Sequence, residues 1–257
     1  MSLLAQLTAA LAGGSVRIVD LTAPLHSDTP ILQLPEIFGQ TARFQLEEIS
    51  RYDDRGPAWY WNNFHTGEHT GTHFDAPNHW VTGQDQHDVA SVPLERLIRP
   101  AAVIDVTDRV ADDHDFLLTK ADVEAWQDEH GPLPEGGWLI LRTGWSSRNH
   151  DQAEFLNADE FGPHTPGIDV ECARWLAEEA PIIGLGVETV GTDAGAAGGF
   201  DPMYPCHTLL LGAGKYGLAQ LQNVDQLPAT GALVITSPLP IVTGSGSPPR
   251  VLALVED

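Results

Sequence analysis

Short apolar runs rich in β-branched residues recur along the chain and predict buried strands. They lie at residues 16–21, 101–106, 138–141, 182–187, 232–235 and 251–255. Between several of these runs the apolar residues have the 3.6-residue period of a helix. Because predicted strands alternate with predicted helices, we expect an α/β domain.

Two of the predicted helices have defined positions. Thr119 followed by Asp122 resembles a capping box, and the helix it opens is expected to run to about His130, where Gly131 and Pro132 end it. A second helix is predicted from about Ile168 to Ala180. Its apolar stripe consists of residues 168, 172, 175 and 176, at positions i, i+4, i+7 and i+8.

The first hundred residues fit this alternation poorly. Residues 38–64 mix polar and aromatic side chains without a helical period, which is more typical of strands or of a covering loop. The sequence contains no linker-like composition shift, repeat or low-complexity segment. We therefore expect a single domain over residues 1–257 with an irregular N-terminal third.

Charge and composition narrow the class of partner. With 36 acidic and 13 basic residues the net charge is −23, which repels phosphate backbones and anionic bilayers. No apolar run reaches the ~20 residues that span a membrane, and residues 1–14 lack the basic start of a signal peptide. The two cysteines, Cys172 and Cys206, are too few for a disulfide framework. We expect a cytoplasmic protein that binds neither nucleic acid nor membranes.

Histidines cluster between residues 65 and 79, together with Glu68 and Asp75. Two imidazoles and one carboxylate can bind a divalent metal and leave positions open for water or substrate. In a straight strand His69 and His73 would stand ~13 Å apart, too far to share an ion. We therefore expect the chain to curl at Gly71 and Pro77 to close the segment. The pattern alone is also compatible with surface histidines or with buried ones bonded to backbone carbonyls.

Residues 69–79, HTGTHFDAPNH, are similar to the H-x-G-T-H-x-D-A-P-x-H signature of the metal-dependent cyclase or kynurenine formamidase-like hydrolases. The resemblance continues at residues 191–193, 205–207, 211–214, 223–228 and 244–250, and so covers nearly the whole chain. It implies an α/β fold with a mixed central sheet or barrel-like β-core flanked by helices, of the swivelling β/β/α type.

The resemblance also implies roles for individual residues. His69, His73 and Asp75 would bind the catalytic metal, and His79 would act as general acid and base. His207 matches a histidine that holds a second ion in the dinuclear formamidases. The bridging glutamate of those enzymes falls at Ala219, beside Gln220, so we predict one ion per site.

A second departure concerns the substrate pocket. The tryptophan that lines it in the formamidases falls at Val19. Both departures argue against hydrolysis of formylkynurenine. Glu68 before His69 and Trp80 after His79 are more similar to the branch that includes isatin hydrolases, which use one manganese ion to open a cyclic amide. Zinc suits the same ligands.

Other residues are candidates for substrate contact. Trp59, Tyr60, Trp61 and Phe64 could form an aromatic wall for a bicyclic substrate, or they could pack in a core or an interface. Glu188 follows a predicted strand and could lie near the pocket, although acidic residues at strand ends also serve as caps.

Three other chemistries are disfavoured. Residues 184–189 lack the third glycine of a dinucleotide-binding fingerprint. Ser245 and Ser247 are not in a G-x-S-x-G elbow. Cys206 beside His207 is predicted to be a buried structural cysteine, because adjacent residues in an extended segment point in opposite directions.

Together these features predict a metal-dependent amidohydrolase that opens a small, isatin-like cyclic amide with water activated by the metal. His79 would take a proton from that water and pass it to the leaving nitrogen. Arylformamidase, lactone hydrolase and polyketide-type cyclase activities are alternatives, and so is a metal-containing ligand-binding protein without turnover. Exposed aromatic and extended segments, together with the resemblance, predict a homodimer or homotetramer.

Overall fold

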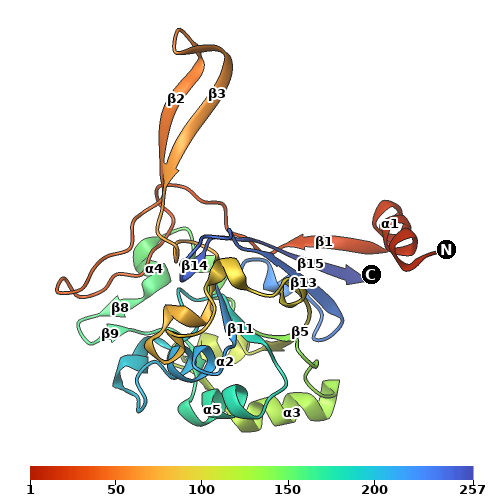
Figure 1. Ribbon diagram of the computed structural model, residues 1–257. Coiled ribbons are helices and arrows are strands. Elements are labelled where there is room, and N and C mark those ends of the chain that lie inside the picture. Colours follow the sequence, from red (N-terminus) through yellow and green to blue (C-terminus); the bar gives the residue numbers. More distant parts are fainter. Residues whose placement is uncertain (257) are drawn as a thin grey trace.

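A mixed sheet of nine strands forms the centre of the computed structural model, which describes residues 1–256 (Figure 1). In spatial order the strands are β1 (Val16–Asp20), β15 (Arg250–Glu256), β13 (Ala232–Ser237), β5 (Ile98–Asp105), β7 (Trp138–Arg142), β11 (Gly184–Val187), β12 (Tyr216–Ala219), β4 (His73–Asp75) and β14 (Gly246–Ser247). All six predicted strands are present, with boundaries shifted by up to three residues.

The direction of the strands follows their burial. Strands β5, β7, β11 and β12 run parallel at the centre, where β7 is buried on both faces and reads as a continuous apolar run. Strands β13 and β15 pair antiparallel and alternate between buried and partly exposed residues. This is the pattern of a sheet that covers the core with one face only.

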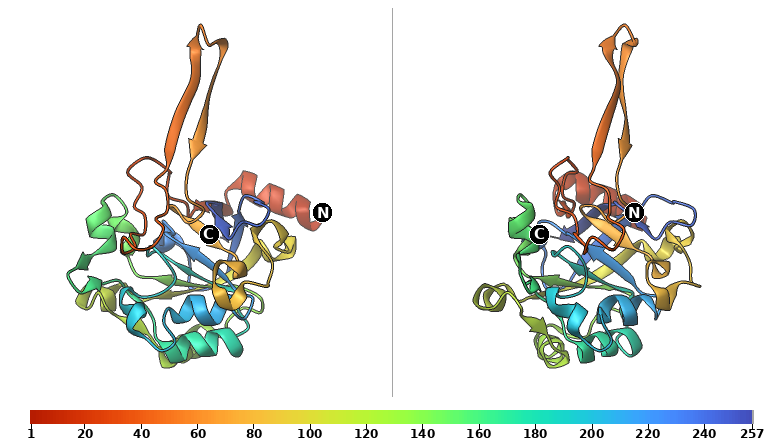
Figure 2. Two further views of the ribbon diagram at one scale, coloured as in Figure 1. Left: turned by 60° about the vertical axis from the view of Figure 1, so that its left-hand side comes forward. Right: turned by 90° about the vertical axis from the view of Figure 1, so that its left-hand side faces the viewer.

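Helices cover one face of the sheet, as Figures 1 and 2 show for α3 and α5. The helices are α1 (Leu3–Gly13), α2 (Thr107–Asp112), α3 (Lys120–His130), α4 (Gln152–Leu156), α5 (Val170–Glu178) and a π-helix (Cys206–Leu211). The capping box of Thr119 and Asp122 is confirmed at the start of α3. The second predicted helix is confirmed as α5, although Ile168 belongs to a short strand before it and Asp169 caps it.

Two apolar cores lie on opposite sides of the sheet. One packs between the sheet and the helices and contains Leu139, Leu141 and Leu176. The other lies inside the curl of the sheet and contains Phe74, Trp138 and Val234. The expected α/β fold, a mixed central sheet flanked by helices, is therefore confirmed. Phe74 comes from the histidine-rich segment, so this segment is anchored in the second core.

The irregular N-terminal third contains a long hairpin that projects from the body of the protein (Figures 1 and 2). Its strands are β2 (Gln45–Asp53) and β3 (Gly56–His65), which pair with each other and not with the central sheet. Most of its side chains are exposed to solvent. The expected strands in this region are confirmed.

The remaining regular segments are short. Strand β6 (Leu117–Leu118) pairs with β10 (Gly167–Ile168), and β8 (Ala158–Asp159) pairs with β9 (Gly162–Pro163). Single 3-10 turns join many of the strands, including η1 (Pro77–His79) directly after β4. Within residues 1–256 no helix combines the length and the apolar character needed to cross a membrane.

Candidate metal centre

The histidine-rich segment enters the sheet through a sharp turn. Gly71 has a φ of +66°, and a Cβ atom there would lie 2.7 Å from the Cδ2 atom of Leu25. The chain then forms β4, which pairs with β12 on one side and with β14 on the other. Pro77 opens the turn η1, which carries His79. The predicted curl at Gly71 and closure at Pro77 are confirmed.

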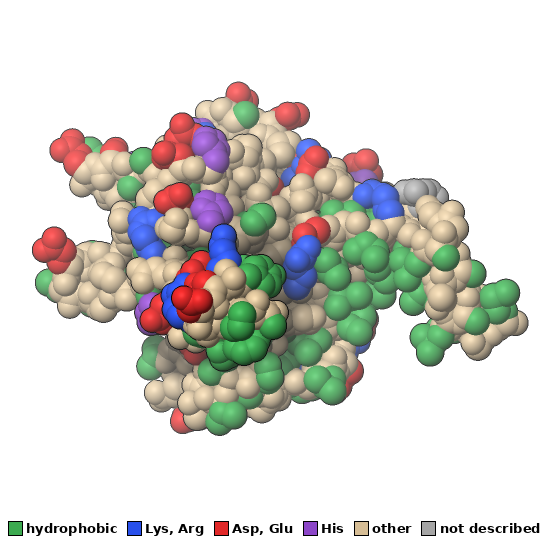
Figure 3. Space-filling model, turned by 90° about the horizontal axis from the view of Figure 1, so that it is seen from above, with side chains coloured by type: hydrophobic (Ala, Val, Ile, Leu, Met, Phe, Trp, Pro, Cys, Tyr) green, Lys and Arg blue, Asp and Glu red, His purple; other side chains and the backbone are tan. Residues whose placement is uncertain are grey.

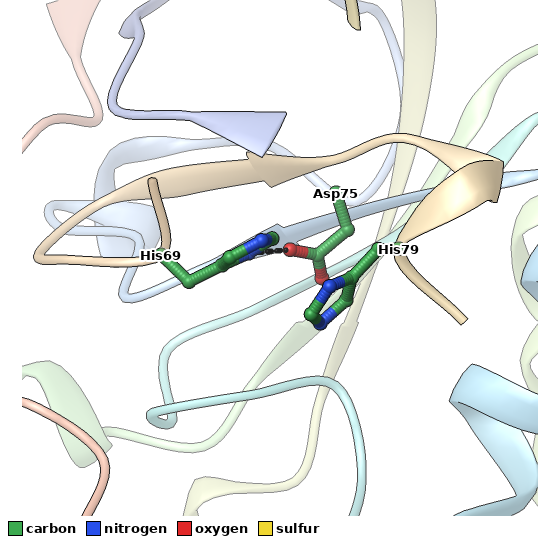
Figure 4. A group of neighbouring side chains, drawn as sticks. All are labelled: His69, Asp75 and His79. Carbon is green, nitrogen blue, oxygen red and sulfur yellow. Dashed lines mark hydrogen bonds and ion pairs between the residues drawn. The ribbon is translucent and has the colours of Figure 1, made fainter. Parts of the chain in front are cut away.

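Three side chains of this segment point toward one another (Figure 4). One nitrogen each of His69 and His79 and one carboxylate oxygen of Asp75 lie within 4.8 Å of one another. The Nδ1 atom of His69 lies 2.8 Å from Oδ1 of Asp75. Asp75 is almost completely buried, with a side chain 1% exposed. A buried carboxylate between imidazole nitrogens is the donor set of a divalent metal site.

His73 approaches the same carboxylate from another side. Its Nδ1 atom lies 2.8 Å from the backbone oxygen of Gly71, which leaves Nε2 facing Oδ1 of Asp75 at 3.5 Å. An imidazole whose other nitrogen donates to a carbonyl is typical of metal ligands. Burial lowers the pKa of His73, so the ring is neutral. His73 thus contacts Asp75 as predicted, but His79 is the second histidine of the tightest group.

His79 stacks on His69, with ring centroids 3.8 Å apart. Burial is the main cause that lowers the pKa of His79 to about 3, and the neighbouring His69 adds to the shift. The ring is therefore neutral at pH 7 and offers a nitrogen lone pair to a cation or to a hydrogen-bond donor. The structure brings the four predicted residues together: His69, His73, Asp75 and His79. Their positions alone do not separate the metal ligands from the acid–base residue.

The neighbouring histidines change the pKa of the Asp75 carboxyl. Burial alone would raise the pKa of this carboxyl, but His73 and His69 lower it more, so the net shift is downward. Asp75 is consequently ionised, while His73 and His79, whose pKa values are lowered mainly by burial, are neutral. An excess of buried negative charge next to unprotonated nitrogens favours a bound cation.

His207 lies next to this group, on the π-helix. Its ring centroid is 5.5 Å from that of His79 and 4.9 Å from that of Trp80. Burial is the largest single influence and lowers the pKa of His207, but the hydrogen bond to Asp193 at 2.5 Å and the negative charges of Asp193 and Asp75 together outweigh it, so the net shift is upward. The structure therefore places His207 and Trp80 at the edge of the site, as the sequence suggested.

Ala219 is the last residue of the neighbouring strand β12, and Gln220 follows it. Ala219 pairs with His73 across β4 and β12, so an alanine occupies the position closest in register to this histidine. Gln220 is fully buried, and its Oε1 atom has no hydrogen-bond partner within residues 1–256. Its Nε2 atom donates to the backbone oxygen of Pro30.

Glu188 is buried, but its carboxylate is already occupied. It accepts hydrogen bonds from the backbone nitrogens of Thr143 and Gly144 and from the hydroxyl of Ser146. These contacts bind the loop after β7 to the end of β11. Glu188 thus caps backbone and hydroxyl groups of this loop, which is the alternative role of an acidic residue at a strand end.

The predicted aromatic wall lies on the projecting hairpin. Trp59, Trp61 and Phe64 are 50%, 54% and 61% exposed. Phe64 stacks on Phe44 near the base of the hairpin. Within the described chain these side chains are thus on the surface and not around the metal-binding group.

Cys206 is buried, as predicted, and burial raises the pKa of its thiol well above the ordinary value. Its sulfur is therefore protonated and a poor nucleophile.

One residue beside the site was not predicted from the sequence. The hydroxyl of Ser245 lies 2.8 Å from Nε2 of His69. The two glycines that flank Ser245 were its one sequence signal, because glycines allow a loop to approach a ligand closely.

Comparison with known proteins adds four findings. The model of the Cyclase family matches residues 19–194. An isatin hydrolase of Roseibium aggregatum is 48% identical over 257 residues, which cover 99% of this chain and 97% of that protein. The solved structure of isatin hydrolase A from Labrenzia aggregata, bound to benzyl benzoate, superposes with a TM-score of 0.97 at 53% identity, over the full length of both chains. A further isatin hydrolase, bound to the product analogue thioisatinate, gives a TM-score of 0.97 at 46% identity, also over the full length of both chains.

Proposed function

The chain belongs to the Cyclase family, and we propose that it is a metal-dependent amidohydrolase that opens the cyclic amide of isatin or a near analogue. The observation that carries the proposal is the agreement over the full length of the chain with an isatin hydrolase bound to an analogue of its product. The buried group of His69, Asp75 and His79 supplies the matching chemistry.

We assign the metal to His69, His73 and Asp75. The Oδ1 atom of Asp75 lies 2.8 Å from Nδ1 of His69 and 3.5 Å from Nε2 of His73. When bound, a divalent ion supplies Lewis acidity, which polarises a carbonyl and makes water more acidic. We propose Mn²⁺, which suits carboxylate and water ligands, with Zn²⁺ as the alternative that imidazoles favour.

One ion per site is proposed because Asp75 is the one carboxylate in the group that the described residues form with His69 and His79, while Glu68 bonds to Ser245 and Asp193 to His207. Two cations a few ångströms apart need a bridging anion to offset their repulsion. The strand position opposite His73 is Ala219, and the adjacent Gln220 is neutral. His207 is held by Asp193 and tends to carry a proton, which opposes a second metal there.

His79 is the proposed acid and base of the reaction. Its ring is neutral and stacked against His69, so it reaches the space next to the ligand group. In hydrolysis it would accept a proton from the attacking water, whose oxygen forms a bond to the amide carbon. As the C–N bond breaks, the same proton passes to the leaving nitrogen, and the ring-opened carboxylic acid releases its remaining proton to solvent as a carboxylate.

We propose that the active protein is a homodimer or homotetramer. Seen along the hairpin, apolar side chains gather between the hairpin and the N-terminal helix (Figure 3). Helix α1 buries none of its residues against the rest of the chain. On β1, β13, β15 and β5 the residues that face away from the inner core include six apolar ones: Ile18, Leu233, Ile235, Leu252, Leu254 and Ile98. A second copy of the chain would cover these surfaces.

The experiment that tests the function is a substrate screen with metal-stripped protein. Isatin, formanilides and lactones are each supplied with Mn²⁺ or Zn²⁺, and turnover is followed by absorbance. The proposal expects loss of isatin absorbance that depends on added metal, and elemental analysis near one ion per chain. Faster hydrolysis of formanilides than of isatin would instead support an arylformamidase.

A further inference from the structure

A chain of three close contacts leads from Glu68 to Asp75 through Ser245 and His69. The Oε2 atom of Glu68 lies 2.6 Å from Oγ of Ser245, and this Oγ lies 2.8 Å from Nε2 of His69. On the other side of the ring, Nδ1 of His69 lies 2.8 Å from Oδ1 of Asp75. The metal ligand His69 is thus held on both of its nitrogens.

Each of these contacts joins two atoms that carry lone pairs, so each needs a hydrogen or a cation between them. The serine hydroxyl supplies one hydrogen and a neutral imidazole supplies one. Two hydrogens cannot serve three contacts. The third contact, at the Asp75 end, needs a second ring proton or a cation, and because a ring that binds a metal has no second proton, the ion of the proposed site would lie there.

The contacts of Glu68 determine which atom donates in each of these hydrogen bonds. The same Oε2 atom also accepts the backbone N–H of Ser245 at 3.1 Å, so this carboxylate oxygen is an acceptor. The hydroxyl of Ser245 therefore donates to Glu68 and presents its lone pair to His69. The ring of His69 must then carry its hydrogen on Nε2, and the lone pair of Nδ1 faces Asp75.

The backbone around Ser245 is built for this contact. A Cβ atom on Gly244 would lie 2.8 Å from Oε1 of Glu68, and one on Gly246 would lie 2.8 Å from Cε1 of His69. Only glycines leave room for both side chains. The loop is fixed to the metal-binding strand, because the amide of Ala76 donates to the backbone oxygen of Ser245 and Gly246 pairs with Asp75.

We propose that Glu68 and Ser245 are positioning residues that hold His69 in the tautomer with hydrogen on Nε2, so that it binds the metal through Nδ1. His73 has the opposite arrangement, with Nδ1 directed at the backbone oxygen of Gly71 and Nε2 free for the metal. This inference rests on the proposed metal site of the amidohydrolase. Hydrogen-bond partners of ligands typically change metal affinity 10- to 100-fold.

The test compares Ser245→Ala with Ser247→Ala. Ser247 lies in the same loop, is fully buried and accepts the amide of Leu239, but the structure gives it no contact with His69. Mn²⁺ is titrated into each metal-free protein. We expect Ser245→Ala to bind Mn²⁺ about 10- to 100-fold more weakly than the wild type, and Ser247→Ala to bind close to the wild-type value. Equal affinities for Ser245→Ala and the wild type would overturn the inference.

A second measurement reads the tautomer directly and does not depend on activity. In zinc-loaded protein with ¹⁵N-labelled histidine, we expect the NMR spectrum to show His69 protonated on Nε2 and His73 protonated on Nδ1. A proton on Nδ1 of His69 would overturn the inference even if affinity fell. Glu68→Gln, which keeps an acceptor oxygen, should preserve the tautomer, whereas Glu68→Ala should not.

Failure of the inference can be told apart from failure of the proposed function. If the wild type binds Mn²⁺ with the expected tautomer but leaves isatin intact, the substrate assignment is wrong and the positioning role stands. If isatin is hydrolysed with added metal and Ser245→Ala keeps full Mn²⁺ affinity, the positioning role is wrong and the function stands. A wild type that takes up neither ion contradicts both.

Discussion

The carboxylate of Asp75 lies 2.8 Å from the ring of His69, six residues earlier in the chain. A straight strand could not place the two side chains together, because each residue advances ~3.3 Å. The left-handed conformation of Gly71 turns the chain between them. The buried site therefore depends on a single backbone position as much as on its ligands.

Replacing that glycine should affect both stability and metal binding. Gly71→Ala forces a Cβ atom into a left-handed conformation and against Leu25, and the conformation alone costs about 1–2 kcal/mol. We expect a lower melting temperature and weaker Mn²⁺ binding. Gly14→Ala is the matched control, because Gly14 also has a positive φ but has no atom within 4 Å of a Cβ there. Normal Mn²⁺ binding by Gly71→Ala would contradict the account.

His79 and His73 should respond differently to removal. His79→Ala is expected to keep the metal while kcat falls about 10²- to 10⁴-fold, the range for loss of a positioned acid–base group. His73→Ala should lose the metal itself, because Nε2 of His73 faces the carboxylate of Asp75.

Metal content and kcat of the two purified variants distinguish the roles. Loss of the metal from His79→Ala, with retention in His73→Ala, would reverse the assignment. This test is needed because the tightest group of potential ligands in the described residues consists of His69, Asp75 and His79.

Asp193 is predicted to control the charge of His207. Burial lowers the pKa of His207, but the hydrogen bond and the charge of Asp193, with a smaller contribution from Asp75, give a net shift above its ordinary value. The pair therefore stabilises the fold below the unfolded pKa of about 6.5, and this contribution is lost as the pH rises through the folded pKa.

Asp193→Asn should lower the pKa of His207, as measured by NMR titration of the histidine rings. His164 is an internal control, because Asp115 and Asp159 raise its pKa independently of Asp193. An unchanged pKa of His207 in Asp193→Asn would show that another group holds its charge.

The hairpin should contribute to assembly. Trp59→Asp combined with Trp61→Asp places two charges on its exposed aromatic surface, so we expect the oligomer to dissociate. Light scattering should give the wild type at least twice the chain mass of 27.8 kDa. Phe161→Asp is the control, since Phe161 is exposed but lies at the turn between β8 and β9. A monomeric wild type would refute the proposed assembly.

Local sequence signals predicted much of the fold. The capping box of Thr119 and Asp122 gave the start of α3, and the apolar runs gave six strands of the sheet. Strands β4, β12 and β14 were not predicted, because they have two to four residues and no period long enough to recognise. Their pairing depends on the tertiary fold, which brings residues 73–75 beside residues 216–219.

The site was predictable where its residues are close in sequence. His69, His73, Asp75 and His79 lie within eleven positions, so ligand spacing and the turn at Gly71 could be read together. Ser245 lies 176 residues from its partner His69, and no local pattern connects the two. Glu188 is a similar case, because its partners in the loop at 143–146, about 45 residues away, determine its role.

Hydrolysis of a cyclic amide at a metal held by Asp75 can be tested by comparing two proteins. Wild-type protein and Asp75→Asn are stripped of metal, supplied with Mn²⁺ and assayed for loss of isatin absorbance. We expect the wild type to hydrolyse isatin when Mn²⁺ is present and not when it is absent. We expect Asp75→Asn, which folds around a neutral amide, neither to retain Mn²⁺ nor to hydrolyse isatin. Equal rates for the two proteins, or intact isatin with the metal-loaded wild type, would show that the cyclic amide is not hydrolysed at a metal held by Asp75.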